Sequence, residues 1–130
     1  MHSNTETLLN TASFYAPNNW VGQVYRVSRQ HPRGRKVQWE CLPFLYPDLN
    51  LFRAYRSGDV DFSGLAVQYH RGLEEKYGQL SALYDWVESV PSLGNFTLLC
   101  FEAAGEPCHR QVLAQWLLEQ VPGLQAGSLR

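Results

Sequence analysis

The hydrophobic pattern of the first third of the chain predicts short strands. Residues 12–15 are predicted to form a short strand, residues 23–28 mix β-branched and aromatic side chains, and residues 36–42 alternate apolar with polar positions. Turn residues separate them, with Pro17 and two asparagines after the first segment and Pro32 and Gly34 after the second. Residues 1–10 are polar and are expected to fray.

Helical spacing dominates the middle of the chain. Asp48 is placed to cap a helix that runs to about Arg56 and stops at Gly58. A second helix opens after Asp61 or at Ser63 and has one apolar face at spacings of three and four residues: Phe62, Leu65, Ala66, Tyr69, Leu73 and Tyr77. Gly78 is expected to break or bend it, and the same spacing resumes from Leu80 until Pro91.

The last third predicts a buried strand followed by a helix. Residues 96–101 form a nearly continuous apolar run, which suits a strand of a parallel sheet covered on both faces. Pro107 fits the first turn of a helix, because its missing N–H is not needed there. The apolar face of this helix comprises Leu113, Trp116, Leu117 and Val121, and Pro122-Gly123 ends it. A strand, a short loop and a helix N-terminus form the unit at which α/β proteins bind ligands.

Together these elements predict a single compact α/β domain over residues 12–121, with a small, mainly parallel sheet sandwiched by helices. The segments 1–11 and 122–130 are expected to be tails. The length of 130 residues and a composition of 45% hydrophobic and 18% charged residues are typical of one globular domain.

Composition also excludes several classes of protein. No apolar run reaches the ~18 residues of a membrane helix, and no secretory signal is visible at the N-terminus. Three cysteines are too few, and odd in number, for a disulfide-stapled domain, so we expect a cytoplasmic protein with reduced thiols. The net charge of −1 argues against a generally basic nucleic-acid coat protein.

The strongest candidate site lies where the apolar strand meets the last helix. Cys100 and Glu102 should lie near the carboxyl end of the strand, and Cys108, His109 and Arg110 in the first turn of the helix. Free N–H groups and the helix dipole favour anions there and lower the pKa of a nearby thiol. We expect no bound metal and no cofactor.

Other interpretations of the same residues stay open. Cys100 and Cys108 are also compatible with simple core packing or with a thiol redox pair, which needs their Cα atoms within ~7 Å. Zinc ligation by Cys100, Glu102, Cys108 and His109 is chemically possible, but the spacing of the cysteines differs from a short knuckle. A tyrosine-phosphatase loop is excluded, because Glu106 occupies the position where that motif needs arginine.

A second candidate feature is a basic segment. Five cations and no acidic residue occur between residues 26 and 36: Arg26, Arg29, Arg33, Arg35 and Lys36. Aromatic neighbours such as Tyr25 and Trp39 add surfaces on which bases stack. Weak, salt-sensitive nucleic-acid binding is one interpretation, with Arg26, Arg33, Arg35 and Lys36 as contacts, and a solvated loop is the other.

The sequence resembles a family found in bacteria and archaea, the domain of unknown function 488. The likeness rests on Leu98-Leu99-Cys100-Phe101-Glu102 followed by Pro107-Cys108-His109-Arg110, supported by Val27-Ser28-Arg29 with Pro32. It covers roughly residues 12–121. The resemblance implies a compact α/β fold with a mainly parallel sheet and no defined activity. It also implies a pocket formed by Ser28, Arg29, Cys100, Glu102, Cys108, His109 and Arg110.

Three functional hypotheses follow. In the first, the protein is a small anion- or phosphate-binding module, for example an accessory to nucleotide or nucleic-acid processing, in which Arg29 and Arg110 converge on the ligand with Ser28 and Cys108 beside them. In the second, it is a thiol enzyme in which Cys100 is the nucleophile, His109 the base, and Glu102 orients the imidazole. In the third, the same residues only hold helix to strand. The sequence leaves the choice, and the oligomeric state, open.

Overall fold

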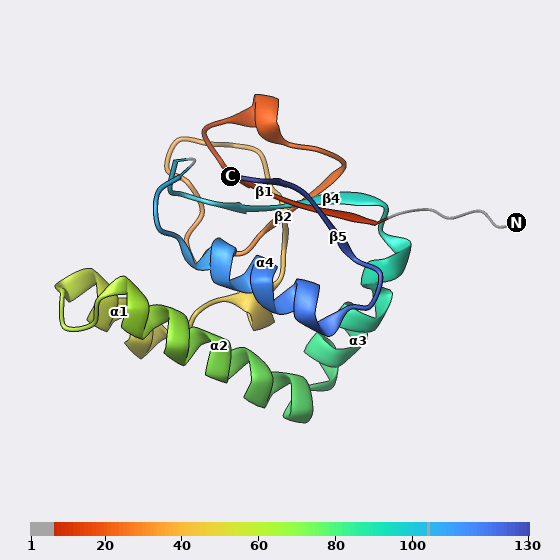
Figure 1. The fold of residues 1–130 in the computed structure, drawn as a ribbon. Helices are drawn as coiled ribbons and strands as arrows, with labels where there is room; N and C mark the ends of the chain where they lie inside the picture. Colours follow the sequence, from red (N-terminus) through yellow and green to blue (C-terminus); the bar gives the residue numbers. More distant parts are fainter. Residues whose placement is uncertain (1–6, 104) are drawn as a thin grey trace, which may run out of the picture.

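A computed structural model describes residues 7–103 and 105–130, and a five-stranded sheet lies at its centre (Figure 1). All neighbouring strands are parallel, in the order β3-β2-β4-β1-β5. The strands are β1 (Leu8–Ser13), β2 (Gln23–Arg26), β3 (Glu40–Cys41), β4 (Asn95–Cys100) and β5 (Gln125–Leu129). The predicted α/β class and parallel sheet are therefore confirmed.

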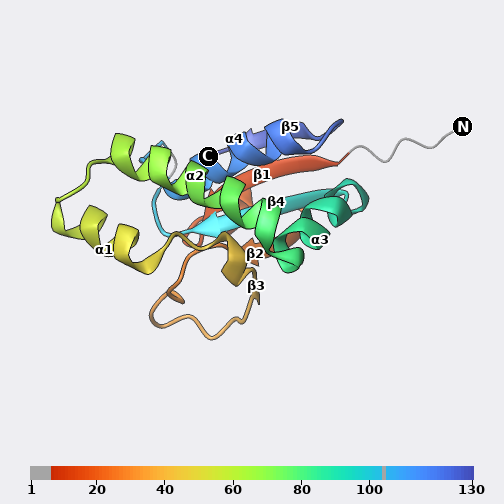
Figure 2. The ribbon, with the colours of Figure 1, turned by 90° about the horizontal axis from the view of Figure 1, so that it is seen from below.

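Four α-helices cover one face of the sheet (Figures 1 and 2). They are α1 (Leu49–Ser57), α2 (Phe62–Gln79), α3 (Ser81–Ser89) and α4 (His109–Gln120). The opposite face carries no α-helix among the described residues. The loops after β1 and β2 cover it instead, where Phe14 and Trp20 pack on Trp39 with ring centroids 4.9 and 5.8 Å apart. The expected sandwich of helices is thus replaced on one side by aromatic side chains from loops.

Local sequence explains most of the helix boundaries. The Asp48 carboxylate accepts hydrogen bonds from the backbone N–H groups of Asn50 and Leu51, which caps α1 as predicted. Gly58 then ends α1 in a left-handed conformation at φ 86°. In contrast, α2 continues through Gly78, because that exposed position tolerates glycine at a modest cost in helix propensity. No helix of the described residues is long and apolar enough to cross a membrane.

The ends of the sheet differ from the prediction. β1 begins at Leu8, inside the segment expected to fray, and β5 lies inside the expected C-terminal tail. The buried side chain of Asn10 explains why both segments join the sheet. Its amide N–H group donates to the Phe96 carbonyl at 2.9 Å, and its amide oxygen accepts from the Ser128 N–H at 2.8 Å. A polar residue thus joins three strands, a role that a hydrophobic pattern does not reveal.

Two predicted strands are shorter than expected. β2 ends at Arg26, although the Val27 N–H still bonds to the Leu99 carbonyl at 3.1 Å. The strand predicted over 36–42 is reduced to Glu40–Cys41, because only these residues pair with β2.

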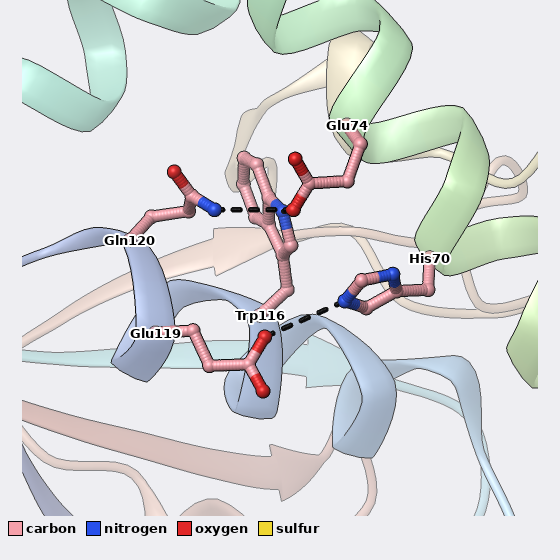
Figure 3. Close-up of polar contacts among 5 residues, drawn as sticks. All are labelled: His70, Glu74, Trp116, Glu119 and Gln120. Carbon is pink, nitrogen blue, oxygen red and sulfur yellow. Dashed lines mark hydrogen bonds and ion pairs between the residues drawn. The ribbon is translucent and has the colours of Figure 1, made fainter.

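Polar contacts fix α2 against α4 (Figure 3). The indole N–H of Trp116, which is fully buried, donates to the Glu74 carboxylate at 2.8 Å, and the Gln120 amide donates to the same oxygen at 3.1 Å. His70 and Glu119 form an ion pair at 3.4 Å on the same seam. These contacts hold the helix that presents Cys108 and His109 to the site.

Candidate functional site

A pocket opens at the carboxyl ends of β2 and β4. After β2 the chain runs to β3 at one edge of the sheet. After β4 it runs through α4 to β5 at the opposite edge. Ligands of open α/β sheets bind at such switch points. The cavity has a volume of about 260 Å³ and is lined by Ser28, Arg29, Gln30, Pro47, Phe52, Tyr55, Arg56, Leu65, Cys100, Phe101, Glu102, Pro107, Cys108 and His109.

Two thiols and an imidazole form the buried end of this pocket. Cys100 is the last residue of β4, Cys108 is the N-cap of α4, and His109 is the first residue of that helix. His109 Nδ1 lies 3.7 Å from Cys100 Sγ and 3.9 Å from Cys108 Sγ. The three ligand atoms lie within 4.8 Å of one another, so this cluster could hold a metal ion.

The His109 ring is fixed in orientation and tautomer. Its Nε2 lies 2.8 Å from the Val27 carbonyl oxygen, which can only accept, so Nε2 carries the proton. In the neutral ring, Nδ1 is then an unprotonated nitrogen that faces both sulfurs. Tyr69 packs edge-on against the ring with centroids 5.5 Å apart and donates its hydroxyl to the Leu45 carbonyl at 2.6 Å.

The two thiols differ in acidity. The hydrogen bond with Cys108, together with burial, raises the pKa of Cys100 well above its ordinary value. Burial also raises the pKa of Cys108, but the hydrogen bonds with Cys100 and His109 and the positive charge of Arg110 outweigh it and lower this pKa. The geometry therefore favours Cys108 over the predicted Cys100 as the thiolate of the pair, because the helix terminus and Arg110 lie beside Cys108.

Glu102 contacts a thiol rather than the imidazole. Its Oε1 lies 3.6 Å from Cys100 Sγ. Burial and the negative charge of Cys108 raise the pKa of this carboxyl. The expected role in orienting His109 is instead held by the Val27 carbonyl, a backbone group that residue types do not reveal.

Two arginines line the pocket without a carboxylate partner. Arg29 donates from Nε to the Pro47 carbonyl at 3.0 Å, and Arg56 lies over the Phe52 ring at 5.8 Å. Within residues 7–103 and 105–130 the one ion pair joins His70 to Glu119, so neither guanidinium is neutralised by an acid there. Lys76 lies nearby: burial, then the charge of Arg29, lowers its pKa. The pocket lining therefore contains two guanidinium groups without an ion-pair partner, together with the Glu102 carboxyl.

Arg110 does not join Arg29. It is fully buried, donates from Nε to the Arg130 carbonyl at 2.9 Å and from Nη2 to the Ala103 carbonyl at 3.3 Å, and is not among the residues that line the pocket. The expected convergence is therefore not found, because Arg110 extends from α4 toward the end of β5. Its Nη1 has no hydrogen-bond partner in the described part of the chain.

The basic segment divides into two parts. Arg26 is tied to the fold, with its Nη2 donating to the Tyr46 hydroxyl at 3.0 Å. Arg33, Arg35 and Lys36 are exposed on the loop between β2 and β3, and Arg35 lies over the Tyr15 ring at 5.2 Å.

Sequence reasoning missed the wall of the pocket that α1 and α2 supply. Phe52, Tyr55 and Arg56 stand at positions three and four apart on α1, and Leu65 comes from α2. The helical spacing of the α1 residues marks one face, which is a usable signal. The spacing does not show that this face lies beside the end of β4, because that contact depends on the tertiary fold.

Comparison with known proteins gives one family. A family model described as "Active DUF488-N3 subclade" matches residues 8–121, which is most of the chain. No curated protein and no solved structure gives a significant match.

Proposed function

The chain belongs to this family, the DUF488-N3 subclade of domain of unknown function 488, and from that premise we propose that its pocket binds and acts on a small anionic ligand. The adjective "active" in the family description fits a pocket that keeps reactive groups. Cys100, Cys108, His109 and Glu102 are such groups, and all four line the cavity.

The unneutralised arginines at the pocket mouth carry this proposal. Arg29 and Arg56 have no carboxylate partner among the described residues, and Lys76 adds a third cation near Arg29. An anion that binds beside these guanidinium groups gains their electrostatic attraction. Guanidinium groups suit phosphate and carboxylate oxygens, which accept two parallel hydrogen bonds.

The size and lining of the cavity narrow the ligand class. A volume of about 260 Å³ admits a small molecule and is too small for an oligonucleotide. Phe52, Tyr55 and Leu65 form an apolar wall. The ligand is therefore a phosphate or carboxylate that carries a small apolar or aromatic group.

The buried end of the pocket supplies the chemistry. Two mechanisms use a pair of thiols beside an unprotonated imidazole nitrogen: attack by a thiolate, and activation of a ligand by a metal ion. Both are compatible with an anion held by Arg29 and Arg56. A reducing, cytoplasmic location belongs to the same proposal, because Cys41, Cys100 and Cys108 are all free thiols.

The proposal is tested by titrating the protein with inorganic phosphate, phenyl phosphate and benzoate in a calorimeter. We expect saturable binding, tightest for an anion that carries a ring. Arg29→Gln and Arg56→Gln should each weaken it about tenfold or more, because a charge-assisted hydrogen bond contributes about 1.5–3 kcal/mol. Arg71→Gln is the matched control, since Arg71 is exposed on α2 and does not line the pocket.

Two outcomes would contradict the proposal. One is the absence of saturable binding for every anion at low ionic strength. The other is binding that the double variant Arg29→Gln/Arg56→Gln retains at the affinity of the wild type.

A further inference from the structure

The buried thiols and His109 have the arrangement of a metal centre. Cys100 Sγ, Cys108 Sγ and His109 Nδ1 lie within 4.8 Å of one another, and the two S···N distances are 3.7 and 3.9 Å. In a tetrahedral zinc site the bond lengths place sulfur and nitrogen about 3.6 Å apart and two sulfurs about 3.8 Å apart. The two S···N distances therefore fit one zinc ion, and the two sulfurs, which lie within 4.8 Å of each other, need to approach by at most about 1 Å.

The hydrogen bonding of His109 is a second, independent observation. The Nε2–H donates to the Val27 carbonyl at 2.8 Å, which is the outer-shell bond that metal-ligating histidines make. It leaves Nδ1 unprotonated and facing both sulfurs, in a histidine whose residue is only 7% exposed. An unprotonated imidazole nitrogen held beside two thiols is the kind of ligand atom that zinc binds.

We infer that Cys100, Cys108 and His109 bind one zinc ion whose fourth coordination position faces the pocket. All three residues line the cavity, so a ligand in the pocket can reach the metal. Two thiolates and an imidazole favour zinc over magnesium or calcium, which prefer oxygen ligands. Three protein ligands with one open position are typical of catalytic rather than structural zinc sites.

The charges around the three zinc ligands indicate what kind of group occupies the fourth coordination position. Two thiolates and a neutral imidazole balance the zinc ion, and Arg110 lies beside Cys108, fully buried and without a carboxylate partner in the described residues. The Glu102 carboxyl, whose Oε1 lies 3.6 Å from Cys100 Sγ, offsets the charge of Arg110, so the attraction for an anionic fourth ligand comes from Arg29 and Arg56 in the lining of the same cavity. This step rests on the proposed function, because the anion held at Arg29 and Arg56 supplies that ligand.

The test is the metal content of the protein, measured by mass spectrometry after purification without chelators. Wild type should hold about one zinc ion per chain, and Cys100→Ser and Cys108→Ser about tenfold less. Cys41→Ser is the matched control and should keep its zinc, because Cys41 is exposed and lies outside the cluster. Cobalt added to the chelated wild type should give the absorption bands of a tetrahedral site with thiolate ligands.

Two results would overturn the zinc site even if a serine variant fails to fold. Chelated wild type that stays folded by circular dichroism, yet takes up neither zinc nor cobalt, would overturn it. Zinc retained at full occupancy in a folded Cys100→Ser/Cys108→Ser variant would overturn it as well. Calorimetric titration of the chelated protein with phosphate measures anion binding at Arg29 and Arg56 in the absence of zinc. Failure of the zinc site and failure of the anion pocket are therefore distinguishable.

Discussion

Tyr69→Phe removes one oxygen atom from the interior next to the site. The hydroxyl donates to the Leu45 carbonyl at 2.6 Å, Tyr69 is 3% exposed and Leu45 is fully buried. Phenylalanine keeps the packing against His109 but leaves the carbonyl unsatisfied. The expected loss of unfolding free energy is about 1–3 kcal/mol. For a loss of about 2 kcal/mol, Tm of a domain of this size falls by about 6–10 °C.

The same variant has a predicted pH dependence. Burial, and then the charges of Cys100 and Cys108, raise the pKa of Tyr69 well above its ordinary value. In the unfolded chain a tyrosine ionises at about pH 10. The hydroxyl therefore stabilises the fold fully below about pH 10, and this contribution is lost as pH rises above that value. The stability gap between wild type and Tyr69→Phe should be constant from pH 7 to 9 and shrink at higher pH.

Urea unfolding followed by circular dichroism measures the gap at each pH. Tyr84→Phe is the control, because Tyr84 is 45% exposed and its loss should change stability by less than about 0.5 kcal/mol. If Tyr69→Phe is as stable as Tyr84→Phe at pH 8, or if the gap widens above pH 10, the role given to this hydrogen bond is wrong.

Three further predictions concern the fold and the basic loop. Glu74→Ala should cost about 1–2 kcal/mol of unfolding free energy, because the buried Trp116 N–H loses its acceptor; Glu74→Gln should cost less than half of this, and equal costs would contradict the assignment. Gly22→Ala should cost at least about 2 kcal/mol, since Gly22 has φ 67° and an added Cβ would lie 1.9 Å from the Asn95 carbonyl oxygen. Gly72→Ala, with open space around it, should instead stabilise α2 by up to about 1 kcal/mol, and the opposite order in urea unfolding would refute the comparison. Nucleic acid, measured by fluorescence anisotropy, should bind only at low salt with a log–log salt slope no steeper than about −3, and replacing Arg33, Arg35 and Lys36 with glutamine should abolish it; unchanged binding would exclude this loop as the contact.

The sequence predicted those elements whose boundaries depend on residues close together in the chain. Asp48 and Gly58 bound a helix through capping chemistry that depends on neighbours in the chain. The apolar run of β4 and the Pro107 helix start placed Cys100, Cys108 and His109 together, because a short loop leaves little freedom between them. These are the parts of the site that lie within ten positions of one another.

Contacts between distant segments could not be predicted in this way. β5 is a mostly exposed edge strand that depends on pairing with β1, and the polar Asn10 that joins them resembles a loop residue in the sequence. Arg110 was assigned to the pocket but extends toward Arg130, whereas Arg56 was not assigned to the pocket and lines it. The relative acidity of Cys100 and Cys108 depends on burial and on the hydrogen bond between the two thiols, which only the fold determines.

The location of anion binding is the most direct test of the account. Amide spectra of the ¹⁵N-labelled protein, titrated with inorganic phosphate, report on each backbone N–H in turn. We predict saturable shifts at Ser28 and Arg29 after β2 and at Cys108 and His109 at the start of α4, since these residues line the pocket. Shifts confined to the exposed loop that carries Arg33, Arg35 and Lys36, or no saturable shift at all, would contradict it.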